Sequence, residues 1–395
     1  MTQTIDPRAA QVHPELERYR DQFPIFERKT YLNSCSLGPL SRRSRTAVGE
    51  FLDLWEDLGA SAWYQIWWGA MTSLRASFAS IIGADVGEVA LTPNATDAFS
   101  AIASALDYAR RPRVVVADLD FPTLTYQWLA RVPDGVEVVF ARSDDGVGVD
   151  LDHFASLIDD STALVATSRV YYKSGYLQDV QAIATMAHDH GALMLVDDYH
   201  GTGQVPIDVH EEGVDMLVTG GLKWLLGGPG IAYLYVRDDV ARTLAPRSTG
   251  WFAHAHQLTF EVENFVPAAD ATRFQGGTPS VAAVYAGQGG LDLVGEIGPE
   301  TLRARTLALA ADVLARADDR GLRVLSPRDD ARRTGIVALQ MDDPAKTVAN
   351  LARENIIVDA RPGLIRVSPY FYNTIEDNAR FFDALAGAIG PSRHF

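Results

Sequence analysis

The middle of the chain alternates short apolar runs with helix-length segments of mixed polarity. Each run is aliphatic or β-branched with little alternation of polar and apolar positions, which is typical of strands covered on both faces of a sheet. Strands and helices in alternation favour an open, mostly parallel α/β sheet of about seven strands sandwiched by helices. The predicted strands are Glu88–Leu91, Val114–Ala117, Val136–Phe140, Ala163–Thr167, Ala192–Val196, Met216–Val218 and Ile231–Val236.

The pattern changes after about Pro279. Residues 281–318 are rich in Ala and Leu and predict long helices, and short strands then alternate with helices expected at about 346–354 and 375–389. Because 395 residues exceed the core of one ordinary domain, we expect an N-terminal arm over 1–45, a large α/β domain over 46–280 and a smaller α+β domain over 281–395. The strands predicted in the last part are Leu322–Val324, Gly335–Gln340 and Ile365–Val367.

Composition and charge narrow the class of protein. The net charge of −16 argues against nucleic acid and anionic membranes as partners. The single cysteine, Cys35, excludes an internal disulfide and any multi-cysteine metal site. Residues 1–30 show no apolar leader, and the apolar stretch Met216–Val236 carries Lys223 and several glycines, which makes it a poor membrane span. The sequence therefore predicts a cytoplasmic protein that acts on a small molecule.

Candidate chemistry gathers at the ends of the predicted strands, where open α/β sheets place their ligands. The first candidate is the segment Thr92–Asp97, which follows one strand and leads into a helix predicted over Ala98–Leu106. Asn94 can cap that helix, and free backbone N–H groups beside it would hold a phosphate against the helix dipole. An ordinary capped helix is the alternative.

The second candidate is the segment Asp197-Asp198-Tyr199-His200, which ends an apolar strand. A carboxylate in this place could face a cationic ring nitrogen and keep it protonated. A loop aspartate that caps the next turn is the alternative. A metal site built from Asp197, Asp198 and His200 is disfavoured because no second cluster of ligands is apparent, so we predict no metal.

Two cationic residues complete the set of candidates. Lys223 lies in an apolar, glycine-rich turn between two predicted strands, where desolvation would lower its pKa and favour an imine-forming amine. A lysine whose amine reaches solvent is the alternative. Arg366, in the C-terminal part, could offer a guanidinium fork to a substrate carboxylate, although most arginines are simply solvated.

These features together describe what a pyridoxal phosphate enzyme needs: a phosphate site, a carboxylate for the ring nitrogen, an imine lysine and a carboxylate-binding arginine. The motifs resemble class V of the aminotransferase fold (fold type I) over nearly the whole chain, and within it they are most similar to the kynureninases. The segments that carry the resemblance are Tyr31–Leu40, Phe121–Thr123, Val170–Gly175, Asp197–His200, Lys223–Gly230, Gly250–His254, Arg273–Pro279 and Arg366–Thr374.

The resemblance implies pyridoxal 5′-phosphate as the cofactor, bound in the large domain, and a role for each matching residue. Lys223 would form the imine with the cofactor, and Asp197 would pair with the pyridine nitrogen. His200 would lie near the phenolic oxygen of the cofactor, and Phe121 would stack on its ring. Arg366 would bind the carboxylate of an α-amino acid substrate.

The same resemblance implies that two subunits share each phosphate site. Ala95 and Thr96 would hold the phosphate together with Trp251. Thr278 would reach the phosphate from the neighbouring subunit. We therefore expect a homodimer with shared active sites.

Departures from the kynureninase pattern bear on the reaction. Kynureninases carry a tyrosine just before the lysine and a hydroxyl residue before that, whereas this chain has Leu222 and Gly221. A phosphate contact and a candidate proton relay are therefore missing from this segment. Cys35 stands where those enzymes usually have asparagine, so the identity of the substrate stays open.

The resemblance predicts an enzyme that cleaves the side chain of an α-amino acid at a Cβ–Cγ or Cβ–S bond. A class V aminotransferase or an amino-acid epimerase would use the same residues with different reprotonation, and both stay open as alternatives. A cysteine desulfurase is less favoured because it needs a mobile cysteine in the C-terminal part, and no cysteine follows Cys35. A non-catalytic binding protein of the same fold is disfavoured because Lys223 and Asp197 are both retained.

Overall fold

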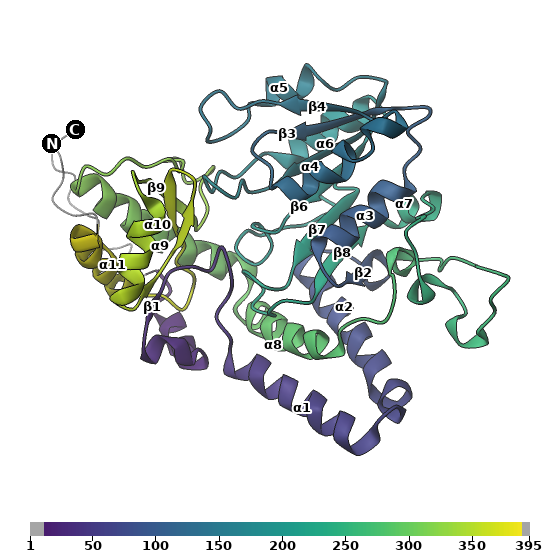
Figure 1. Ribbon diagram of the computed structural model, residues 1–395, viewed down its shortest axis with the longest axis horizontal. Helices are drawn as coiled ribbons and strands as arrows, with labels where there is room; N and C mark the ends of the chain where they lie inside the picture. The colour runs from purple at the N-terminus through teal and green to yellow at the C-terminus, as the bar shows by residue number, and fades with distance from the viewer. Residues whose placement is uncertain (1–11, 389–395) are drawn as a thin grey trace.

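A seven-stranded sheet forms the centre of the larger part of the molecule, which the computed structural model describes over residues 12–388 (Figure 1). β8 runs antiparallel to both of its neighbours and the other strands share one direction, so the predicted mostly parallel sheet is confirmed. Residues 1–11 of the predicted N-terminal arm and 389–395 of the predicted C-terminal domain lie outside the described range. In spatial order the strands are β2 (Val89–Thr92), β8 (Ala232–Val236), β7 (Met216–Gly220), β6 (Leu193–Asp197), β5 (Thr162–Ser168), β3 (Arg113–Ala117) and β4 (Glu137–Ala141).

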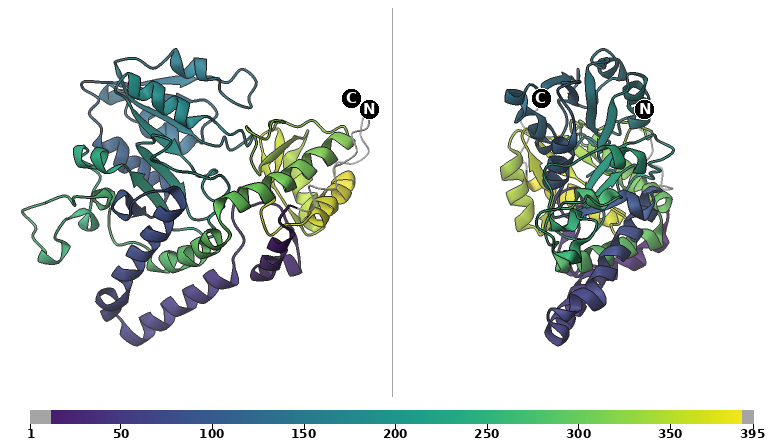
Figure 2. Two further views of the ribbon diagram at one scale, coloured as in Figure 1. Left: turned by 180° about the vertical axis from the view of Figure 1, so that it is seen from behind. Right: turned by 90° about the vertical axis from the view of Figure 1, so that its right-hand side faces the viewer.

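Helices cover both faces of this sheet, because alternate side chains of each strand point to opposite faces. Val115 packs into the core on one face, and Val114 and Val116 pack into the core on the other. Figures 1 and 2 show the sheet between these two layers. The first face is covered by α2 (Trp68–Ile82), α5 (Leu151–Ala155), α6 (Val180–Asp189) and α8 (Val281–Ile297), and the second by α3 (Ala95–Ala105), α4 (Pro122–Leu129) and α7 (Asp238–Thr243).

A smaller antiparallel sheet lies beside α9 (Pro299–Asp319), in the order β11 (Asp359–Arg361), β12 (Leu364–Val367) and β9 (Val337–Gln340). α10 (Pro344–Arg353) and α11 (Ile375–Ala388) complete its core. The predicted strand Leu322–Val324 is wrong, because Val324 forms only one isolated bridge, with Leu339. β11 and the two-residue strand β10 (Ile356–Ile357) have no counterpart in the sequence prediction, since strands this short show no pattern of polar and apolar positions.

Two long consecutive helices, α8 and α9, lie in the chain between the large sheet and the smaller one. α8 packs against α1 (Arg42–Leu58) and α2, whereas α9 packs into the core of the smaller sheet. The division of the chain at residue 280 stays a prediction. Short 3₁₀ helices lie at Pro14–Gln22, Pro24–Glu27, Val86–Glu88, Val132–Asp134, Trp251–Ala253, Gln257–Thr259 and Ala271–Phe274, and a single π-helical turn lies at Trp63–Trp67.

The N-terminal segment is joined to the C-terminal part of the chain. The short strand β1 (Thr30–Tyr31) pairs in parallel with β10. The buried carboxylate of Asp377 accepts hydrogen bonds from Arg20 at 2.7 and 2.9 Å. Gly38 then donates its backbone N–H to the carbonyl of Leu222 at 2.8 Å. The segment after β1 therefore passes from the two-stranded pair of β1 and β10 to the turn that carries Lys223.

α8 presents glycines where it crosses that turn. A Cβ on Gly290 would lie 2.7 Å from the carbonyl carbon of Leu226. A Cβ on the neighbouring Gly289 would lie 2.7 Å from the backbone of Ser44 in α1. Side chains do not approach backbone atoms so closely, so glycine allows α8 to pack directly on the backbone of both partners.

Gly290→Ala is expected to destabilise the fold, because the added methyl group must displace backbone atoms and overpacking of this kind costs about 1–3 kcal/mol. Gly295→Ala, on the same helix, is the matched control, since nothing lies within 4 Å of its Cβ position. Alanine there should gain about 0.5–1 kcal/mol from helix propensity. Urea unfolding of the two variants measures both effects. A Gly290→Ala protein as stable as the wild type would contradict the close packing.

Candidate active site

Six of the nine predicted site residues converge on one pocket of about 350 Å³ at the carboxyl ends of the strands. Arg366, Trp251 and Thr278 are not part of its wall. The predicted residues that do line the pocket are Ala95, Thr96, Phe121, Asp197, His200 and Lys223.

The start of α3 forms one end of the pocket. Asn94 caps this helix, and its side-chain oxygen accepts the backbone N–H of Asp97 at 3.0 Å. The cap makes α3 begin at Ala95, earlier than the predicted Ala98. The N–H groups of Ala95 and Thr96 therefore lie in the first helical turn, where no helical carbonyl is available to them. Together with the helix dipole they suit a phosphate.

Two neighbouring carboxylates at the end of β6 have different surroundings. Asp197 lines the pocket, where burial raises its pKa to about 6 and the charge of Lys223 partly offsets that rise. Asp198 instead accepts a hydrogen bond from Arg169 at 2.8 Å, and Arg169 also pairs with Glu212 at 2.8 Å. Asp197 is thus available to a ligand, whereas Asp198 belongs to a buried ion-pair network.

Lys223 holds its amine in the pocket, 2.8 Å from Nε2 of His200. Burial lowers the pKa of Lys223 to about 7, and the guanidinium of Arg366 adds to this lowering. Burial and the charge of Lys223 hold the pKa of His200 well below its usual range. At neutral pH a partly neutral amine therefore lies beside a neutral imidazole, and both can accept a proton.

Two arginines of the smaller sheet share one carboxylate. Asp359 accepts hydrogen bonds from Arg366 at its Oδ2 atom and from Arg361 at its Oδ1 atom, the latter at 2.7 Å. Arg366 is only 1% exposed and also donates to the carbonyl of Tyr172 at 2.6 Å and to the hydroxyl of Ser36 at 3.1 Å. Protein groups thus hold the fork of Arg366, while Arg361 reaches the pocket wall.

The predicted aromatic and phosphate contacts divide into two groups. Phe121 lines the pocket, is 43% exposed and meets Tyr172 edge-on at 5.2 Å between ring centroids. Trp251 lies outside the pocket, where its indole N–H donates to the carbonyl of Gln257 at 2.7 Å. Thr278 is exposed and also lies outside the pocket. Within one chain, Trp251 and Thr278 are therefore not brought together with the other predicted residues.

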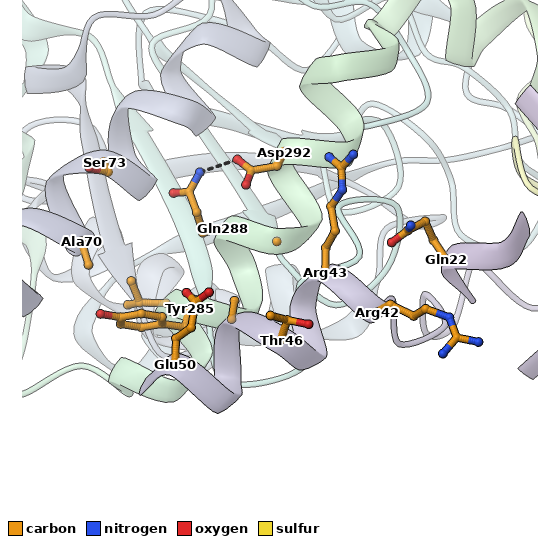
Figure 3. Close-up of a pocket in the computed structure, with 13 residues that line it drawn as sticks. Gln22, Arg42, Arg43, Thr46, Glu50, Ala70, Ser73, Tyr285, Gln288 and Asp292 are labelled. Atoms are coloured by element: carbon orange, nitrogen blue, oxygen red, sulfur yellow. Dashed lines mark hydrogen bonds between the residues drawn. The ribbon is translucent and has the colours of Figure 1, made fainter. Parts of the chain in front are cut away.

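A second cavity, of about 470 Å³, lies between α1, α2 and α8 (Figure 3). Glu50 and Tyr285 line it, and Gln288 donates to Asp292 at 2.7 Å within it. No predicted site residue contributes to this wall. Over residues 12–388, no cluster of His, Cys, Asp or Glu side chains is arranged to hold a metal, and no helix combines the length and apolarity needed to cross a membrane.

Comparison with known proteins bears on the family. The model of the aminotransferase class-V family matches residues 64–381. The chain belongs to the class-V aminotransferase family. Enzymes of this family depend on pyridoxal 5′-phosphate, so the predicted cofactor is confirmed together with the predicted family.

Individual relatives of this class-V enzyme carry several names. The uncharacterized aminotransferase YcbU of Bacillus subtilis is 35% identical, over 94% of this chain and 97% of its own length. The kynureninase of Geobacillus thermodenitrificans is 28% identical, over 92% of this chain and 89% of its own. A cysteine desulfurase from Thermococcus onnurineus shares the fold at a TM-score of 0.86 and 21% identity, over 95% of this chain and 98% of its own. The cystine C–S lyase C-DES shares the fold at a TM-score of 0.86 and 20% identity, over 94% of this chain and 100% of its own.

The pocket of this class-V enzyme also contains residues that sequence reasoning missed. Ser36, Tyr199 and Arg361 all line it. Ser36 and Tyr199 lie inside motif segments, so the motifs themselves could have indicated that both residues are near the site. Arg361 lies in the short strand β11, outside every motif, and only the folded chain brings it to the pocket.

The lowered pKa of Lys223 predicts how its reactivity depends on pH in the cofactor-free protein. Only the neutral amine is a nucleophile, so labelling of Lys223 by an amine reagent should rise with pH and reach half its maximum at about pH 7. The exposed Lys346 provides a comparison within the same sample. Peptide mapping assigns the label, because the lysines are Lys29, Lys173, Lys223 and Lys346. Labelling of Lys223 that rose only in parallel with Lys346 would refute the lowered pKa.

The different surroundings of Asp197 and Asp198 predict different variants. Asp197→Asn should fold normally but slow exchange of the substrate α-proton by about two to four decades, because it removes a charge from the pocket. Asp198→Asn should lower the free energy of unfolding by about 3–5 kcal/mol, since it breaks the buried pair with Arg169. Deuterium exchange at Cα and urea unfolding separate the two effects. Slow α-proton exchange in Asp198→Asn, together with lost stability in Asp197→Asn, would show that the roles of the two carboxylates are exchanged.

Proposed function

We propose that this class-V enzyme cleaves the side chain of an α-amino acid at a Cβ–Cγ or Cβ–S bond, with pyridoxal 5′-phosphate bound to Lys223. The observation that carries the proposal is the contact between the Lys223 amine and His200 at 2.8 Å. Side-chain cleavage needs one proton transfer at Cα and another at Cβ or the leaving group, and two adjacent bases can serve both positions. The similarity to kynureninases over 92% of the chain supports this reaction class.

The residues of the pocket fit the cofactor. The N–H groups of Ala95 and Thr96 suit its phosphate, and the carboxylate of Asp197 suits its ring nitrogen. The amine of Lys223 is suited to imine formation, and the partly exposed ring of Phe121 is suited to stacking. When bound, pyridoxal phosphate supplies an electron sink for negative charge that develops at the substrate Cα.

Residues of the chain would control the protons in this reaction. Asp197, ionised above a pH of about 6, would hold a proton on the ring nitrogen of the cofactor through its negative charge. Lys223 would accept the α-proton of the substrate at Nζ, because part of its amine is neutral at neutral pH. His200 would exchange a proton with Nζ through the 2.8 Å contact and so make the amine available for a second transfer.

The substrate carboxylate would bind at the edge of the smaller sheet. Arg366 is the residue predicted for this role, but its donors are held by Asp359, Ser36 and the backbone of Tyr172. Arg361 shares Asp359 with it and also lines the pocket. We therefore propose that Arg361 presents the cation to the substrate and that Arg366 orients Asp359 and Ser36.

A homodimer with shared sites belongs to the same proposal. Thr278 and Trp251 lie on the surface of the single chain, outside the pocket. The neighbouring stretch also exposes large apolar side chains, and a second copy of the chain would cover them. Those side chains are Leu258, Phe260, Val262, Phe265 and Val266.

Amino exchange is the second candidate, and the observation that favours it is the 35% identity to a relative named as an aminotransferase. Epimerisation would use the same pocket residues. Desulfuration is not proposed, although two of the similar structures are desulfurases. Cys35 is buried and is the only cysteine of the chain, so no mobile thiol is available to take up sulfur. A purely binding role is disfavoured by the reactive Lys223 and its partners.

Incubation with β-substituted amino acids and with kynurenine is the test of reaction type. We expect release of the side chain together with alanine or pyruvate, and none of this release from Lys223→Ala. Kynurenine should react poorly, because Leu222 can neither donate nor accept a proton and a missing acid–base group typically costs a factor of about 10²–10⁴. Efficient release of anthranilate would show a working kynureninase. Stoichiometric amino transfer without loss of the side chain would instead establish an aminotransferase.

A further inference from the structure

Tyr199 is a pocket residue with no role in the proposed reaction. It follows the end of β6 by two residues and lines the pocket together with Asp197 and Lys223. Its ring faces the Lys223 amine, with Nζ at 4.4 Å from the ring centroid. Its hydroxyl makes no hydrogen bond to any residue in the described range 12–388, although the side chain is half-buried. Because the phenol lines the pocket and its hydroxyl has no partner in this range, the hydroxyl is free to bond a ligand there.

The tip of the Tyr199 ring rests on Gly220, the last residue of β7. A Cβ on Gly220 would overlap the hydroxyl oxygen of Tyr199 and its Cζ atom. Gly220 has an ordinary backbone conformation, so glycine is not needed there for a turn. Its missing side chain provides the space in which the phenol lies.

The contacts of the Tyr199 side chain, together with the order of the strands, show on which side of the pocket it lies. β7 lies on the side of β6 that leads to β8 and β2, and β2 leads into α3. The Tyr199 ring packs against the same apolar core as Ala95 and Phe99 of α3. Tyr172, the other phenol of the pocket wall, follows β5 on the opposite side of β6. The Tyr199 hydroxyl therefore lies on the side of the pocket where α3 begins.

The turn before Lys223 offers no side-chain donor on this side. Its residues are Gly220, Gly221 and Leu222, none of which carries a polar side chain. Burial raises the pKa of Tyr199 to about 12, and the charge of Asp197 adds to the rise. The phenol therefore keeps its proton and can donate a hydrogen bond.

We propose that the Tyr199 hydroxyl donates a hydrogen bond to the phosphate of the cofactor. The same phosphate would also accept the N–H groups at the start of α3. This inference rests on the proposed binding of pyridoxal phosphate at Lys223. It assigns to a residue beyond β6 the hydroxyl contact that the lysine turn lacks. Gly220 is the matching part of the arrangement, because any side chain there would displace the phenol.

Binding of pyridoxal 5′-phosphate and of pyridoxal, which lacks the phosphate, to the cofactor-free protein tests the proposal. Tyr199→Phe keeps the ring and removes only the hydroxyl. It should weaken binding of pyridoxal phosphate about 10- to 100-fold, the range for a hydrogen bond to a charged group. Binding of pyridoxal should change less than about twofold, since no phosphate contact is lost. Tyr172→Phe is the matched control and should leave the ratio of the two affinities unchanged.

A hydroxyl exchange provides a second test. Gly220→Ser alone should weaken binding of pyridoxal phosphate, because the new side chain displaces the phenol. In a protein that also carries Tyr199→Ala, Gly220→Ser should instead strengthen binding relative to Tyr199→Ala alone, because it returns a hydroxyl to the vacated space. This reversal of sign is the coupling expected of two residues in contact. Additive losses from the two substitutions would overturn the shared position.

The outcomes separate this inference from the proposed function. Borohydride reduction of the wild-type protein with pyridoxal phosphate should attach the cofactor to Lys223. Attachment elsewhere would refute the proposed function and this inference with it. Attachment at Lys223 with equal losses of pyridoxal and pyridoxal phosphate affinity in Tyr199→Phe would overturn this inference alone, because Tyr199 would then contact only the ring. An unchanged affinity for both ligands would also overturn it.

Discussion

The structure depends on placing an amine where water cannot fully solvate it. Lys223 lies in the turn between β7 and β8, and burial there brings its pKa to about 7. α8 packs on the backbone of this turn through Gly290, the N-terminal segment packs on it through Gly38, and the amine itself lies against the side chains of His200 and Tyr199. A lysine with an ordinary pKa would be almost fully protonated at neutral pH and a poor nucleophile. The lowered pKa of the amine is therefore a consequence of close packing around this turn.

The charges around this amine follow from the alternation of the sheet. Successive residues at the end of β6 face opposite ways, so Asp197 meets the pocket and Asp198 meets Arg169. One carboxylate thus serves a ligand while its neighbour stabilises the loop. At the other side of the pocket, Asp359 neutralises part of the charge of two arginines. The net positive charge that remains suits a substrate that carries a carboxylate.

The sequence predicts the large sheet well, because seven apolar runs in alternation with helices allow few other arrangements. The residues that line the pocket from motif segments, such as Lys223 and Asp197, could be predicted for the same reason: strand ends converge in space. The smaller sheet was harder, since β11 is only three residues long and includes Asp359 and Arg361. The partners of Arg366 could not be predicted, because they come from three separate parts of the chain. The contact of Tyr199 with Gly220 depends on side-chain direction, which no linear pattern encodes.

The pairing of β1 with β10 has a consequence for the newly made chain. Synthesis proceeds from the N-terminus, so Thr30 and Tyr31 have no strand partner until residues 356 and 357 have left the ribosome. The large sheet, over residues 89–236, has all of its strands long before that point. Ser36 lines the pocket and accepts a hydrogen bond from Arg366, and Arg361 also lines the pocket, so these parts of its wall can form only afterwards. The binding pocket is therefore completed at the end of synthesis, and a truncated nascent chain would hold its sheet without a finished site.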